Sequence, residues 1–528
     1  MEKDKQFVMD WVDANKQNIS DWHQIIWNFA EPSLREYKSS RWYVDFLRAD
    51  GWDVEECSGG MPTAFCATWS NGDGPCIGGY AEYDAVPGNC QAADTVEKPR
   101  DGLSKHAPSH TDPHSMLGIA SLGGFLSAKA AMKEFNICGK LKFMGEPAEK
   151  LRMSKPIHAA NGYYDEMDAA ISWHPFGGIM FQSCNTTAWD THSCVGYSLV
   201  YTFETKKDNW FSVAQETTFP GFHASARCPG ANDAAVSMYL LSKMFKEHMY
   251  SANSGCSMNE IIINSGQATA DNLPAPMSQI QFFIRTPEIA IAETIVKILD
   301  NNAESAANAS FCTWKRDWIC KSRPGLPNHV LADATYKNLE IVGPPKYGKA
   351  AIKIAQEIQQ NLGYEPLEKP FSDILERLIT PQEAEKIIRE TLPPWQKYYV
   401  SDDYTEYCWH TPTVRMFIAR PSLKPCAKGE AYPKWVSIAL GGIRECTDPT
   451  FMCASKTIGL TIVDLLVKPE ILRKAKEEFN ERTGGGVGGT KWIPPLCDYE
   501  PAISIKWPEY ITTARGENQW VIPAEGDR

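Results

Sequence analysis

The sequence has no excess of positive charge and no run of basic residues. Its 528 residues include 53 Lys and Arg against 65 Asp and Glu, which gives a formal net charge of −12. A protein that binds nucleic acid needs a positive surface to neutralise the phosphates. Nucleic acid is therefore excluded as the expected partner.

The sequence also lacks long apolar stretches, the pattern of a signal peptide at its start, and paired cysteines. No apolar run reaches the ~18–20 residues that a helix needs to cross a bilayer. The chain begins with a polar amphipathic segment and not with the pattern of a signal peptide. The 16 cysteines are scattered singly, with no Cys-x-x-Cys. We therefore predict a cytoplasmic protein with reduced, mostly buried thiols and no membrane partner.

Length and composition favour a globular protein of two domains. The hydrophobic content of 43% and the charged content of 22% are typical of soluble globular proteins. A chain of 528 residues is too long for one ordinary core.

The apolar pattern of the first part predicts an α/β domain. Strand-like runs at 75–81, 140–144 and 168–173 alternate with a helical pattern over 116–135. This alternation is typical of a largely parallel sheet, whose ligands lie beyond the carboxyl ends of the strands. Four polar residues follow strand-like runs and are expected to meet at one rim: Glu82, Asp84, Glu149 and His174.

A change in the pattern of apolar and polar residues near residue 190 predicts an inserted α+β domain. Strand patterns at 197–204 and 279–285 accompany helical patterns at 232–249 and 287–307. We place the first part of the catalytic domain at 1–188, the insert at 189–322, and the second part with a C-terminal tail at 323–528. In that last part, a single helical pattern at 455–480 precedes the glycine-rich segment 483–489, and residues 343–400 fit no simple pattern.

Potential metal ligands gather in three short motifs. Asp112 and His114 belong to the first, Glu149 is followed by Lys150 in the second, and His174 lies in the third. Two imidazoles, a carboxylate ligand and a spare carboxylate are what a hydrolytic metal site needs. Three alternatives stay open. Asp112 and His114 would only stabilise a loop, and His174 would be a buried histidine that bonds to the backbone at the end of a strand. Glu149 would form a salt bridge with a lysine.

The motifs together make the sequence resemble the co-catalytic metallopeptidases, a family that includes aminoacylases, carboxypeptidases and indole-acetyl-amino-acid hydrolases. The likeness is greatest to the p-aminobenzoyl-glutamate hydrolase type. It implies an α/β catalytic domain with a central mixed sheet, and an inserted ferredoxin-like α+β lid that usually dimerises. The matching segments are, in chain order, 82–88, 110–114, 147–150, 173–175, 222–224, 264–266, 284–288 and 401–403.

The resemblance also implies a two-metal site, from which this sequence departs. Lysines stand at two of the family's ligand positions: Lys150 replaces a glutamate, and Lys434 aligns with a histidine. A protonated lysine donates hydrogen bonds and does not bind metal. We therefore predict one divalent metal per chain (Mn, Zn or Fe), bound by Asp112, His114 and His174.

The remaining roles follow the resemblance. Glu149 is the expected general base, and Lys150 or Lys434 would stabilise negative charge or bind a substrate carboxylate. His223 of the insert is either an oxyanion donor to a partner subunit or an ordinary loop histidine. Asn264 and Arg285 are expected at the substrate carboxylate, although Arg285 is also suited to a structural ion pair. His110, Glu82 and Asp84 are expected to orient the metal ligands without binding metal themselves. Glu146 is expected either on the surface or as a replacement for a lost ligand.

These expectations define a metal-dependent hydrolase of C–N bonds, an amidohydrolase or aminohydrolase. The expected substrate is a small molecule, an N-acyl or N-aroyl amino acid, and the expected assembly is a homodimer or higher homo-oligomer. Two alternatives stay open: hydrolytic removal of an aromatic amino group on the same fold, and a non-catalytic descendant that only binds a ligand.

Overall fold

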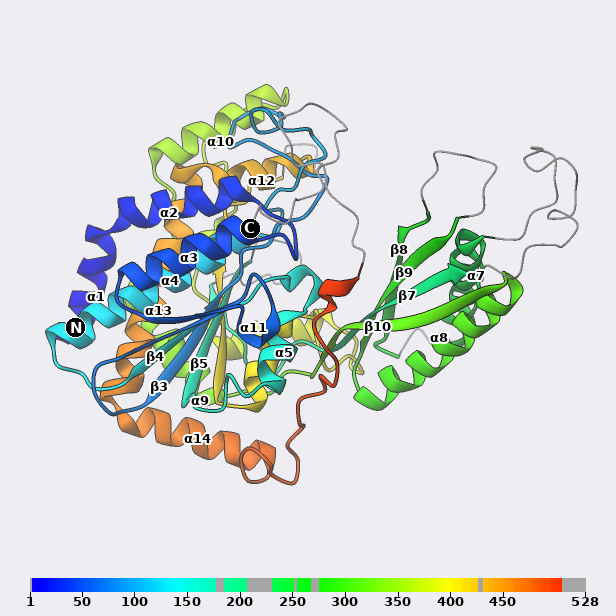
Figure 1. Cartoon of the computed structure of the whole chain (residues 1–528). Coiled ribbons are helices and arrows are strands. Elements are labelled where there is room, and N and C mark those ends of the chain that lie inside the picture. Colours follow the sequence, from blue (N-terminus) through cyan, green and yellow to red (C-terminus); the bar gives the residue numbers. More distant parts are fainter. Residues whose placement is uncertain are drawn as a thin grey trace, which may run out of the picture.

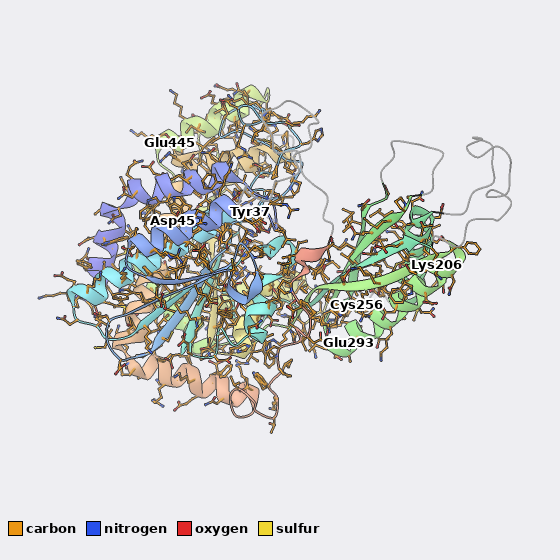
Figure 2. All side chains as sticks on the ribbon, in the orientation of Figure 1. Tyr37, Asp45, Lys206, Cys256, Glu293 and Glu445 are labelled. Atoms are coloured by element: carbon orange, nitrogen blue, oxygen red, sulfur yellow. The ribbon has the colours of Figure 1, made fainter. Side chains whose placement is uncertain are left out.

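The computed structural model describes residues 2–176, 185–206, 230–250, 254–266, 275–425 and 431–505. The chain forms a large lobe built around one sheet and a small lobe built around a second (Figure 1). Side chains fill the interior of both lobes in Figure 2, where Tyr37 marks the large lobe and Glu293 the small one. The thirteen cysteines within the described ranges are free thiols.

Seven strands form the sheet of the large lobe, in the order β1-β2-β4-β3-β5-β11-β6. The central strands β4, β3, β5 and β11 are parallel, whereas β1, β2 and β6 pair antiparallel with their neighbours. The mixed α/β fold class is confirmed, and the parallel part is limited to the four central strands. The bounds are Asp53–Glu56 (β1), Phe65–Ser70 (β2), Cys76–Ala81 (β3), Lys140–Gly145 (β4), Ala169–Phe176 (β5), Thr186–Thr187 (β6) and Thr413–Ala419 (β11).

Two long helices, α4 (His114–Glu134) and α13 (Arg444–Val467), pack against each other in the core. By length and composition both would be able to cross a membrane, so the expectation that no apolar stretch is long enough was wrong. In the fold, 94% and 78% of their apolar windows are buried inside the protein. Burial against protein explains their apolar composition without a membrane.

The helical pattern expected over 455–480 is divided between two helices. α13 ends at Val467, and α14 (Pro469–Thr483) begins at a proline. Proline has no N–H to continue the preceding helix but fits the first turn of a new one. The other helices of the large lobe are Lys3–Ala14 (α1), Lys16–Phe29 (α2), Tyr37–Ala49 (α3), Ser154–Ala160 (α5), His329–Val342 (α9), Lys349–Asn361 (α10), Pro381–Thr391 (α11) and Lys434–Gly442 (α12).

Within the described residues, the small lobe has the strand–helix–strand–strand–helix–strand order of a ferredoxin-like unit. Its four strands are antiparallel and lie in the order β10-β7-β9-β8. Helices α7 and α8 pack on this sheet and enclose a separate apolar core. The elements are Val195–Thr205 (β7), Ala231–Met249 (α7), Ser257–Asn264 (β8), Met277–Thr286 (β9), Ile289–Ala309 (α8) and Cys312–Ser322 (β10).

The segment after α14 crosses from the large lobe to the small one (Figure 1). Arg323 donates a hydrogen bond to the carbonyl oxygen of Ile493, and Tyr499 accepts one from the backbone N–H of Lys321 at 2.7 Å. The ring of Tyr499 also stacks on Trp318 of β10. These contacts hold the small lobe against the large one on the side of β10.

Candidate active site

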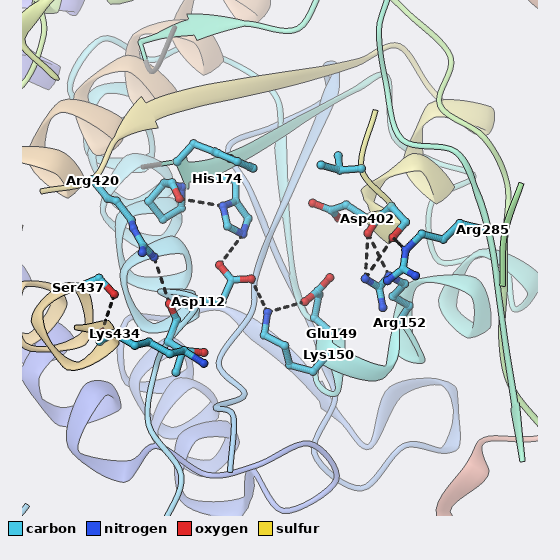
Figure 3. Close-up of a pocket in the computed structure, with 15 residues that line it drawn as sticks. Asp112, Glu149, Lys150, Arg152, His174, Arg285, Asp402, Arg420, Lys434 and Ser437 are labelled. Carbon is cyan, nitrogen blue, oxygen red and sulfur yellow. Dashed lines mark hydrogen bonds and ion pairs between the residues drawn. The ribbon is translucent and has the colours of Figure 1, made fainter. Parts of the chain in front are cut away.

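Polar side chains meet beyond the carboxyl ends of the central parallel strands. Glu82 and Asp84 follow β3, Glu149 begins a 3-10 turn after β4, and His174 lies near the end of β5. His114 is the first residue of α4, which brings it and Asp112 to the same rim. A cavity of about 640 Å³ opens here and is lined by residues of both lobes (Figure 3).

His114 is the residue around which the charged groups gather. Its Nδ1 donates a hydrogen bond to Asp84 Oδ1 at 2.6 Å, which turns Nε2 toward the cluster. Glu82 Oε2 and Glu149 Oε2 each lie 3.2 Å from that Nε2. Burial and Lys150 lower the pKa of His114, but Glu82 and Asp84 raise it more, and it lies well above its ordinary value. This position therefore attracts positive charge.

His174 is oriented in the same manner. Its Nδ1 donates to the carbonyl oxygen of Pro175 at 3.0 Å, and its Nε2 lies 3.3 Å from Asp112 Oδ1. The rings of His174 and His114 are 6.0 Å apart between centroids. In both imidazoles an acceptor holds Nδ1, so that Nε2 faces the cluster and can bind a metal that displaces its proton. Metal-binding histidines have this arrangement.

The donor set fits a divalent cation. Glu82, His114 and His174 offer ligand atoms that all lie within 4.8 Å of one another. The buried Glu82 Oε2 has no hydrogen-bond partner among the described residues, although such an atom normally has one. Neutral imidazoles and carboxylates suit Zn, Mn or Fe(II). Glu82, expected only as a supporting residue, therefore lies as close to the histidines as a ligand would.

The ammonium group of Lys150 lies inside this cluster. Its Nζ is 2.5 Å from Asp112 Oδ2 and 3.1 Å from Glu149 Oε2 (Figure 3). The same Nζ is 2.9 Å from His114 Nε2. The backbone N–H of Lys150 donates to Asp84 Oδ2 at 2.9 Å, which fixes where the side chain starts. A fixed cation thus stands between carboxylates that a second metal would otherwise join.

Glu149 is held in place by a strained turn. The preceding Ala148 has a left-handed backbone (φ 52°), which is uncommon for a residue other than glycine. Its N–H donates to Oε1 of the buried Glu36 at 2.7 Å, and Thr63 Oγ1 donates to the other oxygen of Glu36. Burial and the nearby Asp84 raise the pKa of Glu36 to about 8. Glu36 could not be predicted from the sequence. It lies at the start of a helix and contacts a turn 112 residues later in the chain, and no local pattern indicates such a contact.

A second group missed from the sequence is a buried ion network behind the cluster. Lys155 Nζ lies 2.7 Å from both Glu82 Oε1 and Asp403 Oδ1, and Arg415 pairs with Asp402. The matching segment 401–403 was the only signal for this group. The network leaves one oxygen of Glu82 for the side of His114.

Three further residues, predicted to bind the substrate, have different positions relative to the cavity. Lys434, the first residue of α12, forms part of the wall beside Arg420 (Figure 3). Arg285 of β9 reaches the cavity from the small lobe. Asn264 ends β8, where its Oδ1 accepts the N–H of Gly266 at 2.9 Å, and it is not among the residues that line the cavity. His223 lies outside the described residues.

Two expectations about neighbouring residues were wrong. His110 does not hold a ligand: its Nε2 contacts the carbonyl oxygen of Ile26 at 3.2 Å, and burial and His114 lower its pKa to about 3. Glu146 is neither on the surface nor a replacement ligand. It is fully buried, with contacts to His158 at 2.9 Å, Tyr164 at 2.7 Å and Tyr407 at 2.8 Å.

Comparisons with known proteins agree with this geometry. No family model matches the chain. The chain is 23% identical over 498 residues to one of the subunits of p-aminobenzoyl-glutamate hydrolase from Escherichia coli (strain K12), covering 92% of this chain and 96% of the other. The predicted resemblance is confirmed.

Two solved structures have the same fold. An aminobenzoyl-glutamate utilization protein from Klebsiella pneumoniae matches with a TM-score of 0.52 and 11% identity, over 86% of this chain and 97% of the other. A candidate aminohydrolase from methicillin-resistant Staphylococcus aureus also gives 0.52, with 13% identity, over 88% and 100%. Both lobes therefore belong to one known architecture, because the matches extend over most of both chains.

Proposed function

We propose that this protein hydrolyses the amide bond of N-acyl or N-aroyl amino acids with one divalent metal per chain, held by Asp112, His114 and His174, with Glu82 as a further ligand. The coarser prediction, an amidohydrolase, is confirmed by the similarity to the p-aminobenzoyl-glutamate hydrolase of Escherichia coli. The observation that carries the proposal is the arrangement of His114: its buried Nε2 faces three acidic side chains, two of which, Asp112 and Glu149, line the cavity.

A divalent metal bound there would supply a Lewis acid for the amide carbonyl and lower the pKa of water toward ~7. The chain's own residues provide the rest. Glu149 accepts a proton from the attacking water and delivers it to the leaving nitrogen. Lys150, held by Asp112 and Glu149, places a positive charge beside the oxygen that becomes negative. Asp84 holds the His114 ring in one orientation throughout.

The cavity wall suits an anionic substrate. Arg420 and Lys434 lie on one side of His174 and Asp112, and Arg152 and Arg285 lie on the other (Figure 3). The scissile amide would lie between these sides, next to Glu149. An amino-acid carboxylate then finds a positive partner without crossing the acidic centre.

Hydrolysis of p-aminobenzoyl-glutamate and of a series of N-benzoyl and N-acetyl amino acids tests the proposal. We expect the purified protein to release the free amino acid, to lose this activity on treatment with a chelator, and to regain it with Mn²⁺ or Zn²⁺. Chromatography of the released amino acid measures the reaction. Absence of release from every amide, or hydrolysis that a chelator leaves unchanged, would contradict the proposal.

We also propose that the small lobe forms a homodimer. Val236, Leu240 and Met244 of α7 recur at four-residue spacing and are 49%, 58% and 59% exposed. On the adjacent β8, which is an edge strand of its sheet, Ile261 is 58% exposed. An exposed apolar stripe beside an edge strand is typical of a surface that is covered in an assembly.

Charges placed in this stripe should prevent assembly. The double variant Leu240→Asp and Met244→Asp is expected to be a monomer by light scattering, because each buried carboxylate in a dimer would lack a partner. Ile341→Asp, which changes an exposed residue of α9 in the other lobe, is the matched control and should remain a dimer. A monomeric wild type with full activity would exclude both the dimer and a role of His223 in a partner's site.

A further inference from the structure

One buried carboxyl group behind the active site has no cationic partner. Glu36, the residue before α3, is completely buried, and no basic side chain lies within salt-bridge distance of it in the part of the chain that the structure describes. Its oxygens accept hydrogen bonds from the backbone N–H of Ala148 at 2.7 Å and from Oγ1 of Thr63 at 3.0 Å. Acidic residues are almost never fully buried unless they are paired. If only packing mattered here, an apolar side chain of similar size would serve as well or better.

The N–H that Glu36 accepts belongs to a residue in a strained conformation. Ala148 has a left-handed backbone (φ 52°), which residues other than glycine, asparagine and aspartate rarely adopt. Such strain persists only when the surrounding structure maintains it, and it gathers at functional sites. Glu149, the expected general base, is the next residue in the chain. A change in the backbone of Ala148 would therefore move the carboxylate of Glu149.

The loop that carries Glu36, residues 30–36 between α2 and α3, contacts the site at a second point. Oγ of Ser33 donates a hydrogen bond to Asp84 Oδ2 at 2.7 Å. The loop itself has two left-handed residues other than glycine, Ala30 (φ 40°) and Leu34 (φ 67°), so its shape is also maintained at a cost. The same loop thus contacts both the turn before the base and the carboxylate that orients the nearby imidazole.

We propose that Glu36 is a positioning residue for the reaction: it holds the backbone N–H of Ala148 so that the carboxylate of Glu149 stays directed at His114 Nε2. This inference rests on the proposed function and adds to it a residue that does not touch the substrate. Glu149 lines the cavity, whereas Glu36 is not among the residues that line it. The effect of Glu36 on the reaction must therefore pass through Glu149.

Two replacements of Glu36 separate positioning from packing. Glu36→Leu fills the space without an acceptor and should lower kcat by about 10- to 100-fold, the effect of misplacing a catalytic group by about 1 Å. Glu36→Gln keeps an oxygen for the N–H of Ala148 and should retain most of the wild-type kcat. KM should change little in both, because the cavity wall is intact. Thr63→Val, a milder change that removes the other hydrogen bond to Glu36, should lower kcat less and serves if Glu36→Leu does not fold.

A double-mutant cycle shows whether the effect passes through Glu149. In a Glu149→Gln background, Glu36→Leu should cause no further loss of kcat, because the base is already absent. A residue that only stabilises the fold would lower kcat by the same factor in both backgrounds. The matched control is Glu385→Leu, which removes a carboxylate that accepts the backbone N–H of Thr191 at 2.9 Å outside the cavity. The control should lower Tm and keep the wild-type kcat.

Crystal structures of the full-length variants test the inference without turnover. In Glu36→Leu, Ala148 should leave the left-handed region and Glu149 should lose its 3.2 Å contact with His114 Nε2, whereas Glu36→Gln should keep both. An unchanged kcat in the folded Glu36→Leu or Thr63→Val protein would overturn the inference. So would an equal loss in the Glu149→Gln background, a loss in Glu36→Gln as large as in Glu36→Leu, or an unmoved Glu149. If the wild type hydrolyses no amide, the proposed function fails, and the position of Glu149 in the crystal structures alone decides the inference.

Discussion

Replacement of Glu149 by glutamine is expected to lower kcat by about 10²- to 10⁴-fold, the usual contribution of a general base. Glu149 Oε2 lies 3.2 Å from His114 Nε2 and 3.1 Å from Lys150 Nζ, and Glu149 directly follows the left-handed Ala148. Glutamine has nearly the same size and can keep the hydrogen bond from Lys150. It has no basic oxygen, so only proton transfer is lost.

Steady-state kinetics with p-aminobenzoyl-glutamate, together with metal content and thermal melting, measure this effect. Glu166→Gln is the matched control, because Glu166 forms its ion pair with Lys142 outside the cavity. The control should keep wild-type kcat, and both variants should keep the metal. A Glu149→Gln protein with wild-type kcat would remove Glu149 from the base role.

Replacement of Lys150 by methionine should lower kcat by about 10²- to 10³-fold, the effect of losing one preorganised donor to a developing oxyanion. The ammonium group lies between Asp112 and Glu149, and its distance of 2.9 Å to His114 Nε2 places it at the reacting centre. Methionine keeps the length of the side chain and removes the charge. Lys150→Arg, which keeps a cation, should retain more activity than Lys150→Met.

Replacement of Lys434 is expected to have a smaller effect on catalysis than replacement of Lys150. Lys434→Met should raise KM for an anionic substrate, because Lys434 lies on the cavity wall and not in the acidic centre.

Restoring the family's ligands with Lys150→Glu and Lys434→His should recruit a second metal and impair the native reaction. If Lys150→Met and Lys434→Met both keep wild-type kinetics, the two lysines have no part in catalysis.

The sequence predicts those parts of the site that follow directly from strand ends. Glu82, Asp84 and Glu149 come after buried strands and His174 lies near the end of one, and parallel strands bring their carboxyl ends to one edge of the sheet. The change of pattern near residue 190 predicts an inserted α+β domain, but its ferredoxin-like topology was expected only through the resemblance. The break between α13 and α14 was missed, although Pro469 is a visible signal for it.

The residues that support the site could not be predicted from local pattern. Lys155 and Arg415 are fully charged side chains in the interior, and only tertiary pairing with Glu82, Asp403 and Asp402 makes their burial tolerable. Arg152 lies three residues after Glu149, yet its meeting with Arg285 depends on how the two lobes pack. Pairings between distant segments have no periodicity that a single sequence displays.

The metal content of active, purified protein tests the central claim most directly. Elemental analysis should give about one equivalent of divalent metal per chain, because Lys150 occupies the place between Asp112 and Glu149 that a second metal would need. The same sample should hydrolyse p-aminobenzoyl-glutamate. Two equivalents per chain in the active protein, or full activity with no metal, would contradict the account.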